Sequence, residues 1–135
     1  MQELIGDNKN EFTCGLFRST TGQIRTIVLK RDLADGGYSS YGEVVHDPAI
    51  EQLLLLMADS LSLVGSINVQ LRIGPNGPTI FEINPRFSST IMFRNMLGFK
   101  DVLWCIEDAL GLTLSLDEKR PIGKRFYKGF TEYID

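Results

Sequence analysis

The turn sequence Gly74-Pro75-Asn76-Gly77 constrains the fold of this chain most, because a strand-like run lies on each side of it. Gly65 to Arg72 and Thr79 to Asn84 both alternate apolar and polar residues, which is the period of a half-buried strand. Glycine and proline between such runs favour a tight reversal of the backbone. We therefore predict a β-hairpin closed by a three-residue loop through Pro75, Asn76 and Gly77.

The polar side chains of this hairpin should share one face. In the predicted register Gln70 lies opposite Glu82 and Asn68 lies opposite Asn84. The polar face would consist of Asn68, Gln70, Arg72, Ile80, Glu82 and Asn84, and the core face of Ile67, Val69, Leu71, Phe81 and Ile83. From the pattern alone, a plain solvated strand face is the commoner explanation for such polar residues.

The rest of the chain predicts a second hairpin, a loop and a closing strand. Glu11 to Arg18 and Gln23 to Lys30 are strand-like runs around the turn Ser19-Thr20-Thr21-Gly22. Leu33 to Gly42 is rich in glycine and serine, which predicts a loop. Arg125 to Ile134 alternates again and predicts a strand at the end of the chain.

Helical spacing of apolar residues predicts three helices. The first runs from Pro48 to Leu61, because Asp47 is a good N-cap and proline favours the first helical position. Ile91 to Leu97, capped by hydroxyls of Ser88 to Thr90, and Asp101 to Leu110 form the others. We predict an α+β fold over residues 1–135 as a single domain, with a mainly antiparallel sheet. Its helices should cover one face and leave the other for a ligand.

Composition excludes several classes of protein. The chain has 135 residues, 43% hydrophobic and 23% charged, as expected for a globular domain. A net charge of −3 without a long basic run argues against a nucleic-acid partner. The longest apolar stretch, Leu53 to Ala58, is too short to span a bilayer, and no signal peptide is recognisable. We expect a cytoplasmic protein in which Cys14 and Cys105 are buried thiols.

The polar face of the first hairpin carries the donors that hard cations prefer. Glu82 is the expected carboxylate for Mg²⁺, with Asn84 and Gln70 as neighbouring oxygen donors. Mn²⁺ could replace Mg²⁺ at such a site. Arg86 follows Pro85 at the end of the strand and would bring a permanent planar cation to phosphate groups held by the metal.

The sequence Phe81-Glu82-Ile83-Asn84-Pro85-Arg86-Phe87-Ser88-Ser89-Thr90, preceded by Gly65-Ser66-Ile67-Asn68-Val69-Gln70, resembles the signature of the ATP-grasp superfamily. The similarity is greatest to its carbamoyl-phosphate-synthase-like branch of carboxylate–amine ligases. This resemblance implies that Glu82 and Asn84 bind the Mg²⁺ ions that bridge the ATP phosphates. It implies a catalytic contact of Arg86 with the reacting phosphates and a metal-side position for Gln70.

The resemblance extends to the beginning of the chain. Gln2 to Gly6, with Glu3, is similar to the hinge strand whose backbone meets adenine, and Glu11 matches the glutamate that holds the ribose hydroxyls. Lys30 and Arg31 resemble basic residues on the acceptor side, although a solvated strand end explains them equally well. The family uses ATP to activate a small carboxylic acid as an acyl-phosphate, and an amine then displaces the phosphate.

The resemblance also implies a missing part. Intact relatives have an N-terminal lobe with a glycine-rich loop over the triphosphate, and nothing upstream of Glu3 corresponds to it. We expect a C-terminal portion of an ATP-grasp domain that is inactive without that lobe or a companion chain. The alternative is a non-catalytic nucleotide-binding or assembly module that keeps the fold. Surfaces that normally pack on the lobe would favour a homodimer.

Overall fold

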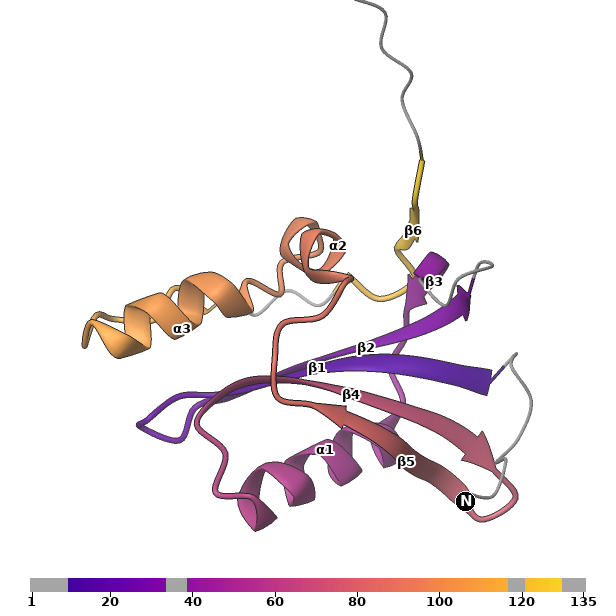
Figure 1. The fold of residues 1–135 in the computed structure, drawn as a ribbon, viewed down its shortest axis with the longest axis horizontal. Helices are drawn as coiled ribbons and strands as arrows, with labels where there is room; N and C mark the ends of the chain where they lie inside the picture. The colour runs from indigo at the N-terminus through magenta and orange to yellow at the C-terminus, as the bar shows by residue number, and fades with distance from the viewer. Residues whose placement is uncertain (1–9, 34–38, 117–120, 130–135) are drawn as a thin grey trace, which may run out of the picture.

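A computed structural model describes residues 10–33, 39–116 and 121–129. Within them one antiparallel sheet has the strand order β5-β4-β1-β2-β3-β6 (Figure 1). The strands are β1 (Glu11–Arg18), β2 (Ile24–Leu33), β3 (Ser39–Val44), β4 (Gly65–Gly74), β5 (Gly77–Asn84) and β6 (Arg125–Tyr127). The helices are α1 (Pro48–Ser60), α2 (Ile91–Met96) and α3 (Asp101–Ala109). The predicted α+β class is confirmed.

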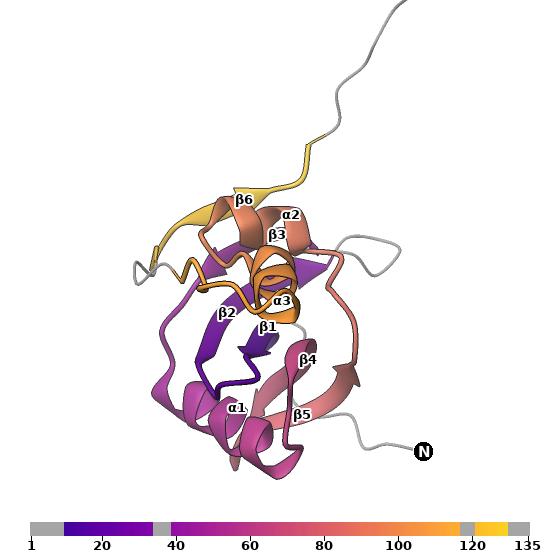
Figure 2. The same ribbon diagram turned by 90° about the vertical axis from the view of Figure 1, so that its left-hand side faces the viewer.

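Helices lie on both sides of the sheet. Both views show α1 on one side and α2 with α3 on the other (Figures 1 and 2). The core beneath α1 consists of Phe12, Cys14, Leu16, Val28, Ile50, Leu54, Met57, Ala58, Ile67, Val69 and Leu71. A second core beneath α2 and α3 consists of Phe17, Ile27, Leu29, Val44, Phe99, Trp104 and Phe126. None of the helices in the described ranges is long and apolar enough to cross a membrane.

The expectation of one entirely open sheet face is therefore wrong. Large apolar side chains such as Phe17 and Leu29 project on the side opposite α1, and Trp104 and Phe99 cover them. Their burial stabilises the fold through the hydrophobic effect, so this half of the face is closed. The open half lies toward β4 and β5, where the side chains on the same face are polar.

The first helix forms as predicted. Asp47 accepts hydrogen bonds from the backbone N–H groups of Ala49 at 3.0 Å and Ile50 at 3.1 Å, and Pro48 occupies the first turn. The buried residues of α1, Ile50, Leu54, Met57 and Ala58, recur at helical spacing and face the sheet. Capping and amphipathic spacing are local signals, which is why the sequence alone predicts this helix well.

The hairpin of β4 and β5 has the predicted register at its open end but a different turn. Asn68 pairs with Asn84 and Gln70 with Glu82, as expected. Gly74 pairs with Gly77, however, so the loop contains two residues, and a β-bulge follows Gln70. The loop is one residue shorter than predicted and the bulge adds one residue to β5, so the register beyond the bulge is the predicted one.

The bulge reverses two predicted side-chain directions. Leu71 pairs with Ile80, which leaves Phe81 without a direct partner. Ile80 packs against the α1 core, and the Phe81 ring meets Arg72, whose guanidinium carbon lies 5.4 Å from the ring centroid. The predictions of Ile80 on the polar face and Phe81 on the core face are wrong, because alternation of side chains breaks at a bulge.

The predicted loop between Leu33 and Gly42 is wrong for its described second half. Ser39–Val44 is β3 and pairs with β2 over Leu29 to Leu33. Strand pairing overrides the weak β propensity of serine and glycine. Of the predicted closing strand from Arg125 to Ile134, Arg125–Tyr127 is confirmed as β6, and residues 130–135 lie outside the described residues.

The two later helices are confirmed with nearly the predicted bounds. Gly98 and Gly111 follow them with φ of 90° and 67°, conformations that favour glycine. The predicted hydroxyl caps of α2 are wrong, because no side chain caps its first turn. Ser88 and Thr90 instead share a hydrogen bond of 2.9 Å between their hydroxyls.

Candidate functional site

A cluster of polar side chains occupies the half of this sheet face that lies toward β4 and β5. It is built by side chains of β1, β2, β4 and β5 on the side opposite α1. We call this cluster the polar end. Its buried members are Glu11, Thr13, Arg31 and Asn68, and its more accessible members are Gln70, Arg72, Glu82 and Asn84. All of these residues except Thr13 were candidates from the sequence pattern or the family resemblance, and antiparallel pairing of β1 with β2 and β4 brings Glu11 and Arg31 beside the β4 residues.

Glu11 lies between two arginines. Arg31 Nη2 donates to Glu11 Oε1 at 2.6 Å, and Arg72 Nη2 donates to Glu11 Oε2 at 2.8 Å. Glu11 is only 2% exposed, so the two guanidinium groups compensate a carboxylate that has lost its water. Both carboxylate oxygens are engaged in this arrangement. The ribose contact of Glu11 stays a prediction.

Gln70 is held by the same arginine. Arg31 Nη2 donates to Gln70 Oε1 at 2.7 Å, across the intervening strand β1. Gln70 lies opposite Glu82, as expected. Its amide oxygen, however, points toward the Arg31 guanidinium. A metal at Glu82 would have to share this oxygen or draw it away from Arg31. The metal-side role of Gln70 stays a prediction.

Glu82 and Asn84 lie together at the exposed end of β5. Asn84 Nδ2 donates to Glu82 Oε1 at 2.8 Å, which leaves Glu82 Oε2 and Asn84 Oδ1 outside this bond. The described residues contain no group of three His, Cys, Asp or Glu side chains that could hold a metal. One carboxylate with amide oxygens is nevertheless a donor set that suits Mg²⁺ when phosphate oxygens and water complete its octahedron. These residues fit a metal that arrives with a phosphate ligand.

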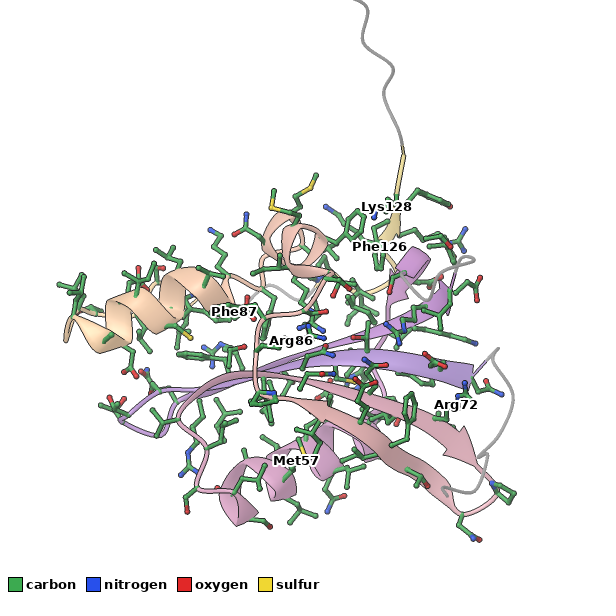
Figure 3. All side chains as sticks on the ribbon, in the orientation of Figure 1. Met57, Arg72, Arg86, Phe87, Phe126 and Lys128 are labelled. Atoms are coloured by element: carbon green, nitrogen blue, oxygen red, sulfur yellow. The ribbon has the colours of Figure 1, made fainter. Side chains whose placement is uncertain are left out.

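Arg86 stands on the segment that joins β5 to α2. Figure 3 shows it on the same side of the sheet as α2, beside Phe87. Its backbone N–H donates to the Asn84 carbonyl at 2.8 Å, and its Nη1 donates to the Phe87 carbonyl at 3.1 Å. The side chain is exposed, so most of its donors face solvent. Glu3 and the predicted hinge strand from Gln2 to Gly6 lie outside the described residues.

Comparison with known proteins decides the family. Residues 7–125 match the family described as ATP-grasp in the biosynthetic pathway with Ter operon. The chain belongs to the ATP-grasp family. The resemblance seen in the sequence is thereby confirmed, although no curated protein matches this sequence.

Solved structures show the same ATP-grasp fold. The phosphoribosylaminoimidazole carboxylase ATPase subunit from Aquifex aeolicus has a TM-score of 0.68 and 17% identity, over 83% of this chain and 36% of that one. N5-carboxyaminoimidazole ribonucleotide synthetase in its ADP complex has a TM-score of 0.64 and 18% identity, over 87% and 32%. L-amino acid ligase from Bacillus licheniformis has a TM-score of 0.61 and 14% identity, over 83% of this chain and 32% of that one. The chain thus spans about a third of these proteins' lengths.

Neither the sequence pattern nor the resemblance pointed to two buried residues of this ATP-grasp chain, Thr13 and Arg94. Arg94 on α2 is 1% exposed, and its Nη2 donates to Asn68 Oδ1 at 2.5 Å and to Thr13 Oγ1 at 3.2 Å. The sequence feature that could have indicated Arg94 is its position on the buried side of a largely apolar helix, next to Phe93. Burial lowers the pKa of the Arg94 guanidinium to about 10, so the group remains charged at neutral pH.

Proposed function

We propose that this ATP-grasp chain binds ATP with Mg²⁺ at the polar end and serves the ATP-dependent joining of a small carboxylic acid to an amine. The carboxylic acid would be activated as an acyl-phosphate, as in carboxylate–amine ligases of the carbamoyl-phosphate-synthase-like branch. The observation that carries the proposal is the Glu82–Asn84 pair on β5, opposite Gln70 and followed by Arg86. The ADP complex of a protein with the same fold agrees with a nucleotide ligand.

The charges of the site suit a polyphosphate. Arg31 and Arg72 together exceed the single charge of Glu11, which they bracket at 2.6 and 2.8 Å. Arg86 adds an exposed guanidinium whose planar donors match phosphate oxygens. Glu82 would then supply the one carboxylate that a phosphate-bound Mg²⁺ or Mn²⁺ needs. When bound, the metal would neutralise phosphate charge during the transfer.

Arg86 has the catalytic part in this proposal. Charge moves onto the bridging and terminal phosphate oxygens as the acyl-phosphate forms, and a preorganised cation stabilises it most where water is excluded. Glu82 and Asn84 would bind the metal. Gln70, whose amide oxygen is bonded to Arg31, would lie beside them on the metal side. No side chain of the chain has to act as a nucleophile, because a carboxylate oxygen of the substrate attacks the terminal phosphorus of ATP, the bond to the bridging oxygen breaks and ADP leaves.

The chain would act together with a further lobe or a companion chain. It spans about a third of the length of the proteins that share its fold, and Glu82 and Arg86 are exposed. Exclusion of water normally requires closure of a second element over the phosphates. We expect weak ATP affinity and no turnover for the chain by itself, self-association as a homodimer, and a cytoplasmic location.

The test is a titration of ATP, with and without Mg²⁺, monitored by ¹H–¹⁵N NMR. It compares the wild-type chain with a variant that carries both Glu82→Ala and Asn84→Ala. We expect Mg²⁺-dependent shifts at the polar end that the variant loses. Asp59→Ala is the matched control, because this exposed carboxylate pairs with Arg18 beside α1. Equal shifts in the variant and the wild type would refute the proposed site. A site that binds but never turns over, even with its companion, would favour the non-catalytic module.

A further inference from the structure

We infer that Arg94 is a positioning residue of the proposed ATP site, which locks the Asn68 side-chain amide and thereby presents Asn68 Nδ2 to Asn84. This inference rests on the proposed function and adds to it a residue outside the resemblance motif. Among the described residues, Arg94 donates hydrogen bonds to Asn68 and Thr13, so its effect on Glu82 and Asn84 would be transmitted through Asn68.

The Asn68 amide oxygen is held by two buried donors. Arg94 Nη2 donates to Asn68 Oδ1 at 2.5 Å, and Thr13 Oγ1 donates to the same oxygen at 2.8 Å. The three residues are at most 2% exposed, so water cannot replace either donor. A flipped amide would turn its own N–H groups toward a guanidinium that has no acceptor. The amide is therefore locked with its oxygen toward Arg94.

The locked amide faces the predicted metal ligands. Asn68 and Asn84 are direct cross-strand partners on one face of the hairpin, where such side chains are in reach of one another. With its oxygen occupied, Asn68 offers its Nδ2 donor on the other side. Asn84 already donates its own Nδ2 to Glu82 Oε1, so its oxygen is the group left for a metal or for Asn68. A bond from Asn68 Nδ2 to Asn84 Oδ1 would therefore orient Asn84 and, through the Asn84–Glu82 bond, Glu82.

Stability alone does not explain the arginine. Its Nε and Nη1 atoms are buried without a hydrogen-bond partner among the described residues. Asp101, itself 1% exposed, is the main opposite charge near it but is held by Ser66 Oγ at 2.8 Å. Buried charges with unmet donors oppose folding, and an apolar side chain of similar volume is often at least as stable. An apolar residue would, however, leave the Asn68 amide free to flip.

The test compares Arg94→Met with wild type by the Asn68 and Asn84 side-chain amide signals in ¹H–¹⁵N spectra and by Mg²⁺–ATP affinity. Met has a similar length and no donor. In the folded variant we expect shifted and faster-exchanging Asn68 amide protons, and an ATP affinity weaker by about tenfold, the equivalent of one lost hydrogen bond. Arg94→Lys should restore part of both signals, because an ammonium still donates to Asn68 Oδ1.

Thr13→Val is the second variant, and it decides the question if Arg94→Met does not fold. It removes the other donor to Asn68 with little change of volume. We expect the same amide shifts and a smaller loss of affinity. Unchanged amide signals and affinity in a folded variant, while Glu82→Ala abolishes binding, would overturn the role of Arg94 and leave the proposed function intact. Binding that survives Glu82→Ala would instead overturn the proposed function, and the amide signals would still report on Arg94.

Discussion

Arg31 and Gln70 share a hydrogen bond of 2.7 Å although β1 lies between their strands. The guanidinium reaches over β1 because Glu11, on the same face, draws it there with a bond of 2.6 Å. One buried ion pair thereby determines the orientation of a predicted metal-side residue. Changes to Glu11 should alter both stability and the site.

Replacing Glu11 with glutamine should destabilise the protein strongly. Glu11→Gln removes the charge that compensates Arg31 and Arg72, and loss of one partner of a buried ion pair costs about 3–5 kcal/mol. Urea unfolding followed by the fluorescence of Trp104, the single tryptophan, measures the free energy of unfolding. Glu43→Gln is the control, because its pair with Arg125 is exposed and should contribute little. Equal effects of the two variants would contradict the buried role.

Alkaline pH should weaken the fold through Cys14. Burial raises the pKa of this thiol from 9.0 to about 12, so the native state retains a proton that the unfolded state loses above pH 9. The stabilisation is complete below pH 9 and is lost as pH rises toward 12, by up to about 1.4 kcal/mol per pH unit. Cys14→Ala has no thiol to titrate, so the difference in free energy of unfolding between wild type and Cys14→Ala should become smaller between pH 9 and pH 12. Parallel pH profiles for the two proteins would show that the thiol does not titrate differently on folding.

Alanine at position 42 should loosen the sheet edge. An added Cβ at Gly42 would lie 2.3 Å from the Phe126 ring and 2.9 Å from the Lys30 carbonyl oxygen. We expect Gly42→Ala to lower the free energy of unfolding by about 1–3 kcal/mol and to displace β6, visible as faster hydrogen exchange there. Gly129→Ala is the matched control, since nothing lies within 4 Å of its added Cβ. Wild-type exchange in β6 of Gly42→Ala would refute this packing.

Metal binding should require the nucleotide. Glu82 is the one carboxylate of the Glu82–Asn84 pair, and a single carboxylate binds Mg²⁺ or Mn²⁺ weakly without phosphate oxygens. We expect no measurable Mn²⁺ signal change in electron paramagnetic resonance for the chain alone. Addition of ATP should produce a protein-bound signal that Glu82→Ala loses. Tight Mn²⁺ binding without ATP would indicate a closed metal site instead.

Features that depend on neighbours along the chain could be predicted from the sequence. The α1 helix was predictable because Asp47 caps it and Ile50 and Leu54 repeat at its period. A hairpin between β4 and β5 was predictable because the two runs are joined by a short turn, but the pairing of Gln70 with Glu82 agrees with the prediction because the bulge compensates for the shorter loop. The donors of the proposed metal site followed from that pairing and from the resemblance to ATP-grasp proteins.

Contacts between residues far apart in the sequence could not be predicted in the same way. The bulge at Phe81 could not be predicted from the alternation of apolar and polar residues. The loop is one residue shorter than predicted and the bulge adds one residue to β5, so the pairing at the open end of the hairpin is the same with or without both. Strand β3 forms because β2 offers it an edge, and its own residues favour a loop. Arg94 meets Thr13 across 81 positions of sequence, and Arg72 meets Glu11 across 61. Such contacts depend on how the sheet and helices pack, since no local propensity encodes a partner so far along the chain.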